Sequence, residues 1–338
     1  MPFQHLTLPK VDNLPATDHL SESWHQWSQR EIDALTLAVA AKRPLLVRGE
    51  PGTGKTQLAR AAANHLGWAL ESVTIHSRYE PQDLLYRFDA VKRLADAQLR
   101  DVGADWLVKR KAGYWEPGPL WRAFGWRSAV RYGSCRSLAA KPAPKGHVLL
   151  IDEIDKAEAD LPNALLEVLG QRSFRIPALN LAVGGPDQPL PLVIITTNEE
   201  RELPPAFLRR CVVLNLDAGA QTYAHFLLER GKAHFSKVAK LRPKPLMDEA
   251  VLKEAARQLD QDRRNAQEAN LPPPGVAEYL DLLYALHDLA PGDEAAQLDW
   301  LKKLKDYAFR KHGRVEGHPE LDQHPPAEGA AGAERGEA

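Results

Sequence analysis

The sequence predicts an α/β fold built on a parallel sheet, followed by a smaller all-α domain. In the first two thirds of the chain, short apolar runs alternate with helical stretches, as in sheets whose strands are buried on both faces. Two of these runs are followed by glycine-rich or acidic residues, and no strand-like run follows residue 217. We therefore expect an irregular arm at 1–24, an α/β domain at 25–217, a helical domain at 218–312 and a disordered tail at 313–338.

The composition is that of a globular protein. The chain has 338 residues, 44% of them hydrophobic and 26% charged, which is enough for two domains. Its net charge of −1 gives no general reason to expect nucleic acid or an anionic membrane as a partner. The two cysteines, Cys135 and Cys211, fit neither a metal site nor a disulfide framework, so each is expected to be a small buried apolar residue. We find no apolar run of membrane length and no secretory signal, and we expect a cytoplasmic protein.

A glycine-rich stretch follows the first expected helix, at 24–41, and a short apolar run at 44–48. Residues 49–56 read GEPGTGKT and fit the phosphate-binding pattern G-x-x-x-x-G-K-[ST], and a helix expected at 57–66 completes the strand–loop–helix context. The backbone N–H groups of such a loop cradle phosphate, while Lys55 is expected to reach the β- and γ-phosphates and Thr56 to ligate Mg²⁺. The expected nucleotide-binding residues are Gly49, Glu50, Pro51, Gly52, Thr53, Gly54, Lys55, Thr56 and Gln57.

Between residues 76 and 145 the alternation of strands and helices stops. A second strand is expected at 68–75, and after it residues 83–100 have the pattern of an exposed charged helix. Aromatic residues then gather in the stretch 114–121, which reads YWEPGPLW. We interpret 76–145 as an insertion into the α/β domain. Two interpretations of it stay open: a long loop that is simply packed, or a surface that contacts a partner or substrate.

A second motif follows this insertion. The apolar run 147–151 predicts a buried parallel strand, and Asp152 and Glu153 come directly after it, at the sheet edge where ligands bind. Asp152 is expected to hold Mg²⁺, partly through water. Glu153 is expected to orient or deprotonate the water that attacks the γ-phosphate. The alternative is a strand that ends in a helix-capping aspartate.

The rest of the α/β domain ends in further candidate residues. A helix at 159–169, stopped by Gly170, precedes a hairpin within 173–192 and a buried strand at 192–198. Asn198 closes this strand and is expected to bond the γ-phosphate or the attacking water, or else to cap a turn. Arg209 and Arg210 end a short helix at 203–211, before a strand at 212–214. These arginines are either surface charge or groups that reach a neighbouring subunit's nucleotide. Four helices follow, at 219–239, 247–264, 274–290 and 296–311.

In this order, the stretches resemble the AAA+ ATPases, and among them the MoxR-like branch, which includes relatives paired with von Willebrand factor A domain proteins. The resemblance covers about residues 25–311. Residues 49–56 resemble the Walker A motif of the family, and residues 148–153 resemble its Walker B motif. The hairpin near 173–192 is similar to the extra hairpin of this branch. Asn198 resembles the polar residue of the family that is called sensor 1. The arginine-finger segment resembles 203–210, with Arg210 the better finger and Arg209 the second choice.

The resemblance implies a P-loop NTPase fold. Its five-stranded parallel sheet would lie between helices, and a C-terminal all-α lid would follow. It also implies a ring, usually of six subunits, in which ATP and Mg²⁺ bind between the two domains and the next subunit supplies an arginine. One feature departs from the family. The segment 273–279 lacks the arginine that the family often has there, called sensor 2, and Arg263 and Arg264 upstream are its possible substitutes.

The first functional hypothesis is an ATP-hydrolysing, chaperone-like remodeller of a protein client, with residues 114–121 as the candidate contact surface. The second is a nucleic-acid motor or restriction-type subunit. The third is a slow nucleotide-dependent switch, against which the intact pair Asp152 and Glu153 argues. The second hypothesis depends on a local basic stretch within a near-neutral chain, made up of Arg122, Arg127, Arg131, Arg136, Lys141 and Lys145.

Overall fold

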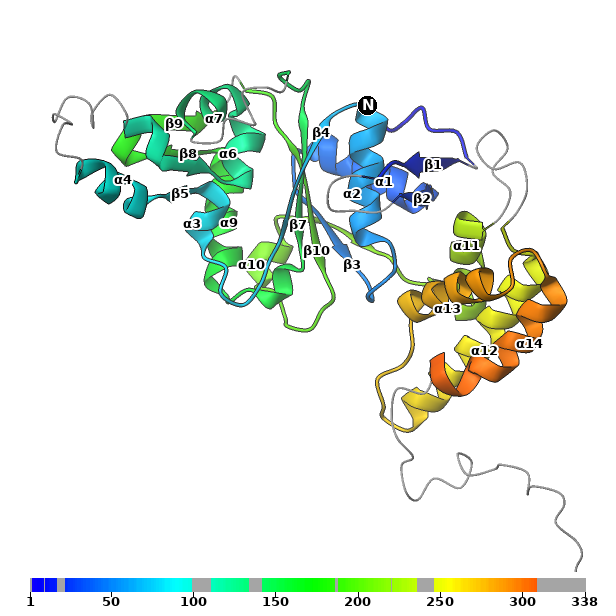
Figure 1. The fold of residues 1–338 in the computed structure, drawn as a ribbon. Helices are drawn as coiled ribbons and strands as arrows, with labels where there is room; N and C mark the ends of the chain where they lie inside the picture. Colours follow the sequence, from blue (N-terminus) through cyan, green and yellow to red (C-terminus); the bar gives the residue numbers. More distant parts are fainter. Residues whose placement is uncertain are drawn as a thin grey trace, which may run out of the picture.

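The computed structural model describes residues 2–8, 10–16, 22–98, 111–133, 142–185, 188–219, 221–235 and 246–308. A parallel sheet with helices on both faces lies beside a separate all-helical domain (Figure 1). The predicted fold class, an α/β sheet sandwiched by helices with a C-terminal all-α domain, is thereby confirmed. The predicted disordered tail at 313–338 and Cys135 lie outside the described residues.

The central sheet has five strands, all parallel, in the order β11-β3-β10-β7-β4. The strand that precedes the glycine-rich loop, β3, therefore pairs with two strands that come much later in the chain. This order places the carboxyl ends of β3, β7 and β10 side by side at one edge of the sheet, where open α/β sheets bind ligands. The strands are β3 Leu45–Arg48, β4 Ala69–Thr74, β7 His147–Asp152, β10 Leu192–Thr197 and β11 Val212–Asn215.

Each central strand buries side chains on both faces. In β7, Leu149 and Ile151 belong to the apolar core on one side of the sheet, and Val148 and Leu150 belong to the core on the other. These four residues are at most 1% exposed. Continuous apolar runs in the sequence are the consequence of this two-sided burial.

One face of the sheet is covered by α1 Gln29–Ala41 and α2 Lys55–Leu66 (Figure 1). The expected irregular arm at 1–24 is not irregular throughout, because β1 Val11–Leu14 and β2 Ser23–Gln26 form an antiparallel pair. Buried Arg60 of α2 anchors this pair through hydrogen bonds to Pro15 O at 2.7 Å and Ser23 Oγ at 2.9 Å. The helix expected from residue 24 begins only at Gln29, where Ser28 and Glu31 form a capping box.

The expected charged helix at 83–100 is the main error in the insertion. It is divided into α3 Pro81–Leu85, β5 Tyr86–Phe88 and α4 Ala90–Ala97, because β5 pairs with β6 Trp115–Pro117. The aromatic stretch 114–121 is core rather than surface, since Tyr114, Trp115 and Trp121 are 2%, 7% and 0% exposed. For these residues the packing interpretation is the correct one.

The second face of the sheet packs against the insertion and the helices that follow β7 and β10 (Figure 1). The hairpin predicted within 173–192 is present. The helix expected to stop at Gly170 continues to Gln171 and ends on Arg172 in the left-handed conformation. The elements of this side are α6 Pro119–Phe124, α7 Trp126–Tyr132, α9 Asp160–Gln171, β8 Ser173–Ile176, β9 Leu181–Gly184 and α10 Pro205–Leu208.

The helical domain has its own apolar core, with Leu227, Leu252 and Leu283 at 0% exposed. It meets the α/β domain at β2, on which its first helix packs, and at the glycine-rich loop, which the start of its third helix approaches. Within the described residues, no helix is both long and apolar enough to cross a membrane. The helices are α11 Tyr223–Phe235, α12 Glu249–Glu268, α13 Val276–Leu289 and α14 Glu294–Ala308.

Candidate active site

A cavity of about 470 Å³ lies between the carboxyl edge of the sheet and the helical domain. Of the predicted site residues, ten line it: Pro51, Gly52, Thr53, Gly54, Lys55, Thr56, Gln57, Asp152, Glu153 and Asn198. Gly49, Glu50, Arg209 and Arg210 are not among its lining residues. The sheet order explains this convergence, because β3, β7 and β10 are neighbours and their polar ends meet at one edge.

The glycine-rich loop has a backbone that only glycine adopts without strain. Gly52 has a φ of +80°, and a Cβ atom there would lie 2.4 Å from the backbone nitrogen of Ala277 at the start of α13. Glycine therefore lets the loop turn and lets the helical domain approach it closely. The helix α2 begins directly after Gly54, so its N-terminal N–H groups face the cavity side of the loop.

Lys55 extends back along the loop. Its Nζ donates hydrogen bonds to Gly49 O at 2.6 Å and Glu50 O at 2.9 Å, and the residue is 7% exposed. Burial lowers the pKa of Lys55 from its ordinary value, and the nearby carboxylates, Asp152 first among them, partly oppose this change. The ammonium group is thus held by two carbonyl oxygens at the mouth of a glycine loop, a position suited to binding phosphate oxygens.

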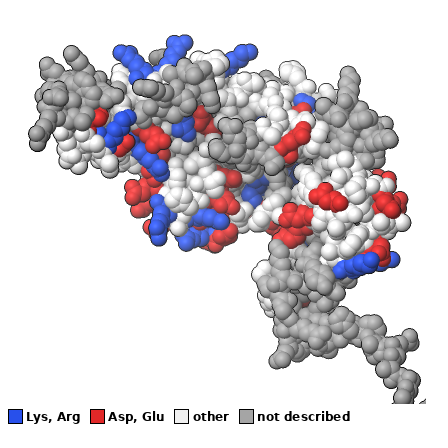
Figure 2. Space-filling view, in the orientation of Figure 1, with Lys and Arg blue, Asp and Glu red and all other residues white. Residues whose placement is uncertain are grey.

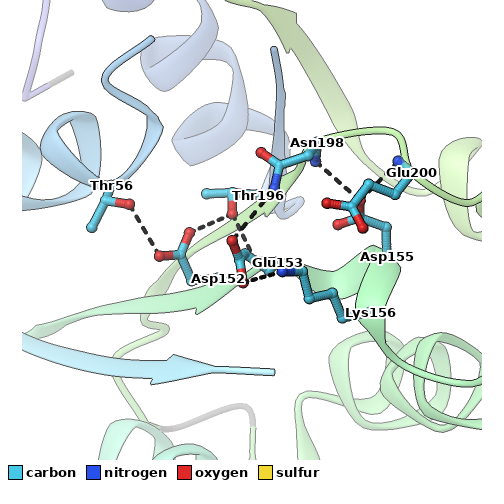
Figure 3. Close-up of polar contacts among 8 residues, drawn as sticks. All are labelled: Thr56, Asp152, Glu153, Asp155, Lys156, Thr196, Asn198 and Glu200. Atoms are coloured by element: carbon cyan, nitrogen blue, oxygen red, sulfur yellow. Dashed lines mark hydrogen bonds and ion pairs between the residues drawn. The ribbon is translucent and has the colours of Figure 1, made fainter. Parts of the chain in front are cut away.

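Asp152, the last residue of β7, connects α2 to β10 through its two carboxylate oxygens (Figure 3). Thr56 Oγ1 donates to Asp152 Oδ2 at 3.0 Å, and Thr196 of β10 donates to the other carboxylate oxygen. Among the described residues, no group of three or more His, Cys, Asp and Glu side chains is placed to hold a metal ion. Mg²⁺ commonly takes one or two protein oxygens and completes its shell with water and phosphate, so Thr56 and Asp152 fit Mg²⁺ bound together with a nucleotide.

Glu153 has an unusual backbone and two side-chain partners. Its φ of +59° and ψ of +49° place it in the left-handed region, which is uncommon for a residue with a side chain. Its N–H donates to Thr196 Oγ1 at 2.9 Å. The carboxylate accepts from Asn198 Nδ2 at 3.4 Å and pairs with Lys156 Nζ at 3.3 Å (Figure 3). The two predicted hydrolytic residues are therefore in direct contact.

The loop after β10 is tied to the turn after β7. Asp155, in the 3₁₀ turn Ile154–Lys156, is 1% exposed. Its Oδ2 accepts from the N–H of Asn198 at 3.2 Å and from the N–H of Glu200 at 3.0 Å. Glu200 and Lys156 also line the cavity.

Glu50 contacts the helical domain rather than the cavity. Tyr223 donates its hydroxyl proton to Glu50 Oε2 at 3.2 Å, and Arg263 forms an ion pair with Glu50 Oε1. The Arg263 guanidinium lies 4.2 Å from the centre of the Tyr223 ring and donates to Pro274 O at 3.0 Å. Arg263, which the sequence offered only as a possible substitute for sensor 2, thus reaches the glycine-rich loop.

Several cavity residues were missed at the level of sequence. Trp24, His25 and Gln26 of β2 line the cavity, as do Lys156 and Arg230. Arg230 lies on α11, and its Nη1 is 3.9 Å from the position of a Cβ on Gly54. For Lys156 a signal was available, because it lies in the run Asp155-Lys156 that closely follows the carboxylates Asp152 and Glu153. For Arg230, no local pattern distinguishes a cavity residue from a surface arginine.

Arg209 and Arg210 lie at the end of α10 and are exposed. Arg43 Nη1 donates a hydrogen bond to the backbone oxygen of Arg209 at 3.3 Å. This bond holds the backbone and involves neither the Arg209 nor the Arg210 guanidinium group. Their assignment as arginine fingers stays a prediction.

Residues 44–211 match the family model for the AAA domain of the dynein-related subfamily. Two uncharacterized proteins of Methanocaldococcus jannaschii are each 24% identical to the chain over 146 residues, which is 43% of this chain and 30% and 29% of theirs. The match therefore spans less than a third of the length of these relatives.

Among solved structures, a mutant of Thermotoga maritima RuvB is similar with 16% identity and a TM-score of 0.39, over 77% of this chain and 71% of RuvB. The RuvB Holliday junction branch migration motor of the same organism has 17% identity and a TM-score of 0.37, over 77% and 70%. Likeness at this level carries no argument about activity. The family match and the Walker-type residues around the cavity are the basis for an activity: residues 44–211 match an AAA domain, a type of domain with ATPase activity, and the cavity holds the residues expected of one.

Proposed function

We propose that the chain binds ATP with Mg²⁺ in this cavity and uses hydrolysis to remodel or activate a protein partner, as one subunit of a ring. The supporting observation is the contact between Glu153 and Asn198. These residues directly follow two different strands, and Asn198 Nδ2 and Glu153 Oε1 meet 3.4 Å apart in the cavity that the glycine-rich loop also lines. A carboxylate and an amide in that position suit the activation of a water molecule in line with a γ-phosphate.

In this proposal Glu153 accepts the proton of the attacking water, and Asn198 orients that water or the γ-phosphate. Lys55 and the N–H groups at the start of α2 stabilise the negative charge that spreads over the phosphate oxygens. Bound Mg²⁺, held by Thr56 and Asp152, would neutralise part of the phosphate charge. These are the residues that the cavity brings together.

The ring is proposed because the candidate arginines are not part of the chain's own cavity. Arg209 and Arg210 are exposed, and neither lines the space between the two domains. An arginine so placed can complete the site of an adjacent subunit, where such a group contributes roughly 10³–10⁵ in rate. We assign this role to Arg210 first and to Arg209 second. The MoxR-like resemblance suggests six subunits.

The partner proposed is a protein client in the cytoplasm. The MoxR-like resemblance suggests that it is a von Willebrand factor A domain protein. Residues 114–121 do not offer an apolar client surface, because all of them except Glu116 are buried. Within the described part of the insertion, the exposed large apolar side chains are instead Val91 and Leu94 of α4, at 80% and 61% exposed.

The described residues do not favour a nucleic-acid motor. Arg122 forms an ion pair with Glu71 at 2.7 Å, and Arg131 stacks on Tyr132. Arg136 and Lys141 of the predicted basic stretch lie outside the described residues. Figure 2 shows some Lys and Arg side chains alone along the upper edge and a mixture of Lys, Arg, Asp and Glu below it, with no continuous basic stripe across the visible face. A nucleic-acid motor is expected to carry a basic stripe instead.

The test is the ATPase rate per molecule, measured against protein concentration for the wild type, Arg210→Ala and Arg209→Ala. We expect the specific rate to rise with concentration as subunits assemble. Arg210→Ala should lose turnover by roughly 10³-fold while retaining ATP affinity. A flat specific rate, with no loss in either variant, would contradict the shared site and favour a slow monomeric switch.

A further inference from the structure

The loop that carries Asn198 leaves the sheet immediately. The strand β10 ends at Thr197, and Glu199 follows in the left-handed conformation with a φ of +63°. This reversal turns the N–H groups of Asn198 and Glu200 toward the same point, which forms a small anion-binding concavity of the backbone. In this chain the anion at that point is the buried side chain of Asp155.

Asp155 has no access to the nucleotide. It is 1% exposed and does not line the cavity, unlike its neighbours Glu153 and Lys156. Its contacts therefore assign it no direct part in hydrolysis. Asp155 instead joins the turn Ile154–Lys156, which directly follows Glu153, to the loop that begins with Asn198 (Figure 3).

We infer that Asp155 is a positioning residue for Asn198, and that its two hydrogen bonds to the loop set the distance between Asn198 and Glu153. This inference rests on the proposed function, because it presumes that Asn198 takes part in hydrolysis. Hydrogen bonds from backbone N–H groups to a carboxylate are stronger than those to a neutral acceptor. The isosteric amide of an asparagine would keep the shape of the side chain and weaken both bonds.

The consequence is a loss of rate rather than a loss of binding. The N–H bonds hold the segment from which the Asn198 side chain projects, 3.4 Å from Glu153 Oε1. A displacement of about 1 Å in a positioned group is enough to cost roughly 10²-fold in rate. Among the described residues, the hydrogen bonds of Asp155 go to the loop after β10 and not to the glycine-rich loop, and Asp155 acts on Lys55 only through its charge. Nucleotide affinity should therefore change little.

The experiment is a double-mutant cycle of Asp155→Asn and Asn198→Ala. For each protein, kcat and KM for ATP are measured, nucleotide affinity is titrated with a fluorescent analogue, and the melting temperature is recorded. Asp160→Asn, an exposed aspartate at the start of α9, is the matched control.

We expect Asp155→Asn to lower kcat by roughly 10- to 100-fold while nucleotide affinity stays within about threefold. In the Asn198→Ala background the same substitution should add no further loss, because the group that it positions is absent. Equal losses in both backgrounds, or no loss in the single variant, would overturn the inference. If Asn198→Ala alone keeps the wild-type kcat, the catalytic assignment of Asn198 in the proposed function fails instead, and the inference fails with it.

Hydrogen exchange on the wild-type protein is a second test, and it needs no variant and so does not depend on whether a variant folds. The amides of Asn198 and Glu200 should be protected although they follow the last residue of β10. Exchange at the rate of an open loop would mean that Asp155 does not hold this segment in solution.

Discussion

The backbone of Glu153 is the most unusual feature of a single residue in the cavity. A side chain in the left-handed region costs of order 1 kcal/mol or more and persists only where surrounding contacts hold it. Here the N–H is fixed by Thr196, and the carboxylate is fixed by Asn198 and Lys156. In this conformation Glu153 is one of the residues that line the cavity.

Replacement of Glu153 by glutamine should separate binding from chemistry. Glutamine keeps the shape of the side chain but cannot accept a proton from water. We expect Glu153→Gln to bind ATP with near wild-type affinity and to lose turnover by roughly 10²–10⁴-fold in single-turnover assays. Glu158→Gln, an exposed glutamate nearby, is the control. A wild-type rate in Glu153→Gln would remove Glu153 from the reaction.

His25 should make stability depend on pH. It is 2% exposed, and burial lowers its pKa below 6.5, although Glu31 at 3.7 Å acts in the opposite direction. In the unfolded chain histidine titrates near its ordinary pKa of about 6.5, so below that pH the unfolded state binds more protons than the folded state. The free energy of unfolding should therefore fall as the pH drops from about 7 toward the lower, folded pKa, by at most about 1.4 kcal/mol per pH unit.

The measurement is the melting temperature of the wild type and His25→Gln between neutral and mildly acidic pH. The variant should show a shallower decline, and His147, whose pKa burial also lowers, should supply part of what remains. His225→Gln, which changes an exposed histidine of α11, is the control. An identical decline in the wild type and His25→Gln would show that His25 does not couple protons to folding.

At the scale of elements, the sequence predicted the strands well because buried parallel strands leave continuous apolar runs. All five sheet strands were expected near their observed positions, and so was the hairpin β8–β9. The errors fall where tertiary pairing overrides local pattern. Residues 83–100 have a sequence pattern typical of a helix, but β5 forms a strand because it pairs with β6, which lies more than 25 residues later in the chain.

Short polar strands gave no such signal. The segment Ser23–Gln26 contains no apolar run. It nevertheless forms β2, because it pairs with Val11–Leu14 and because Arg60 of α2 donates a hydrogen bond to Ser23. Its location beside the cavity follows from that packing alone. The aromatic stretch 114–121 was ambiguous for the opposite reason, since aromatic clusters occur both in cores and at interfaces.

For the candidate site, the sequence predicted residues that the order of the strands brings together. Lys55, Thr56, Asp152, Glu153 and Asn198 all line the cavity, and their roles toward nucleotide and Mg²⁺ stay predictions. The groups that come from other parts of the chain could not be located, because their place depends on how the two domains meet. Arg230 and the partners of Glu50 are examples.

The whole molecule is organised by the meeting of its two domains at the glycine-rich loop. Arg263 is 12% exposed and connects the helical domain to Glu50, while Gly52 lies against Ala277. Removal of the Arg263 charge should loosen the loop. We expect Arg263→Met to weaken ATP binding about five- to tenfold, with a smaller change in kcat at saturating ATP.

Isothermal titration of the nucleotide would measure this effect. Arg257→Met on the same helix is a suitable control, since Arg257 is 67% exposed and pairs with Glu254 within α12. A cycle with Glu50→Gln should show that the two substitutions are not additive. Unchanged affinity in Arg263→Met would mean that the contact holds the domains together without influencing the loop.

The contact of Arg263 and Tyr223 with Glu50 has one more consequence. Because the phosphate-binding loop and the helical domain share a charged residue, ATP cannot reshape the loop without changing the energy of that domain's position. Thermodynamic reciprocity then applies in both directions. Any partner that pulls on the helical domain must alter the affinity for ATP by the factor with which ATP alters the affinity for that partner. A client could in this way report its engagement to the nucleotide without touching the cavity.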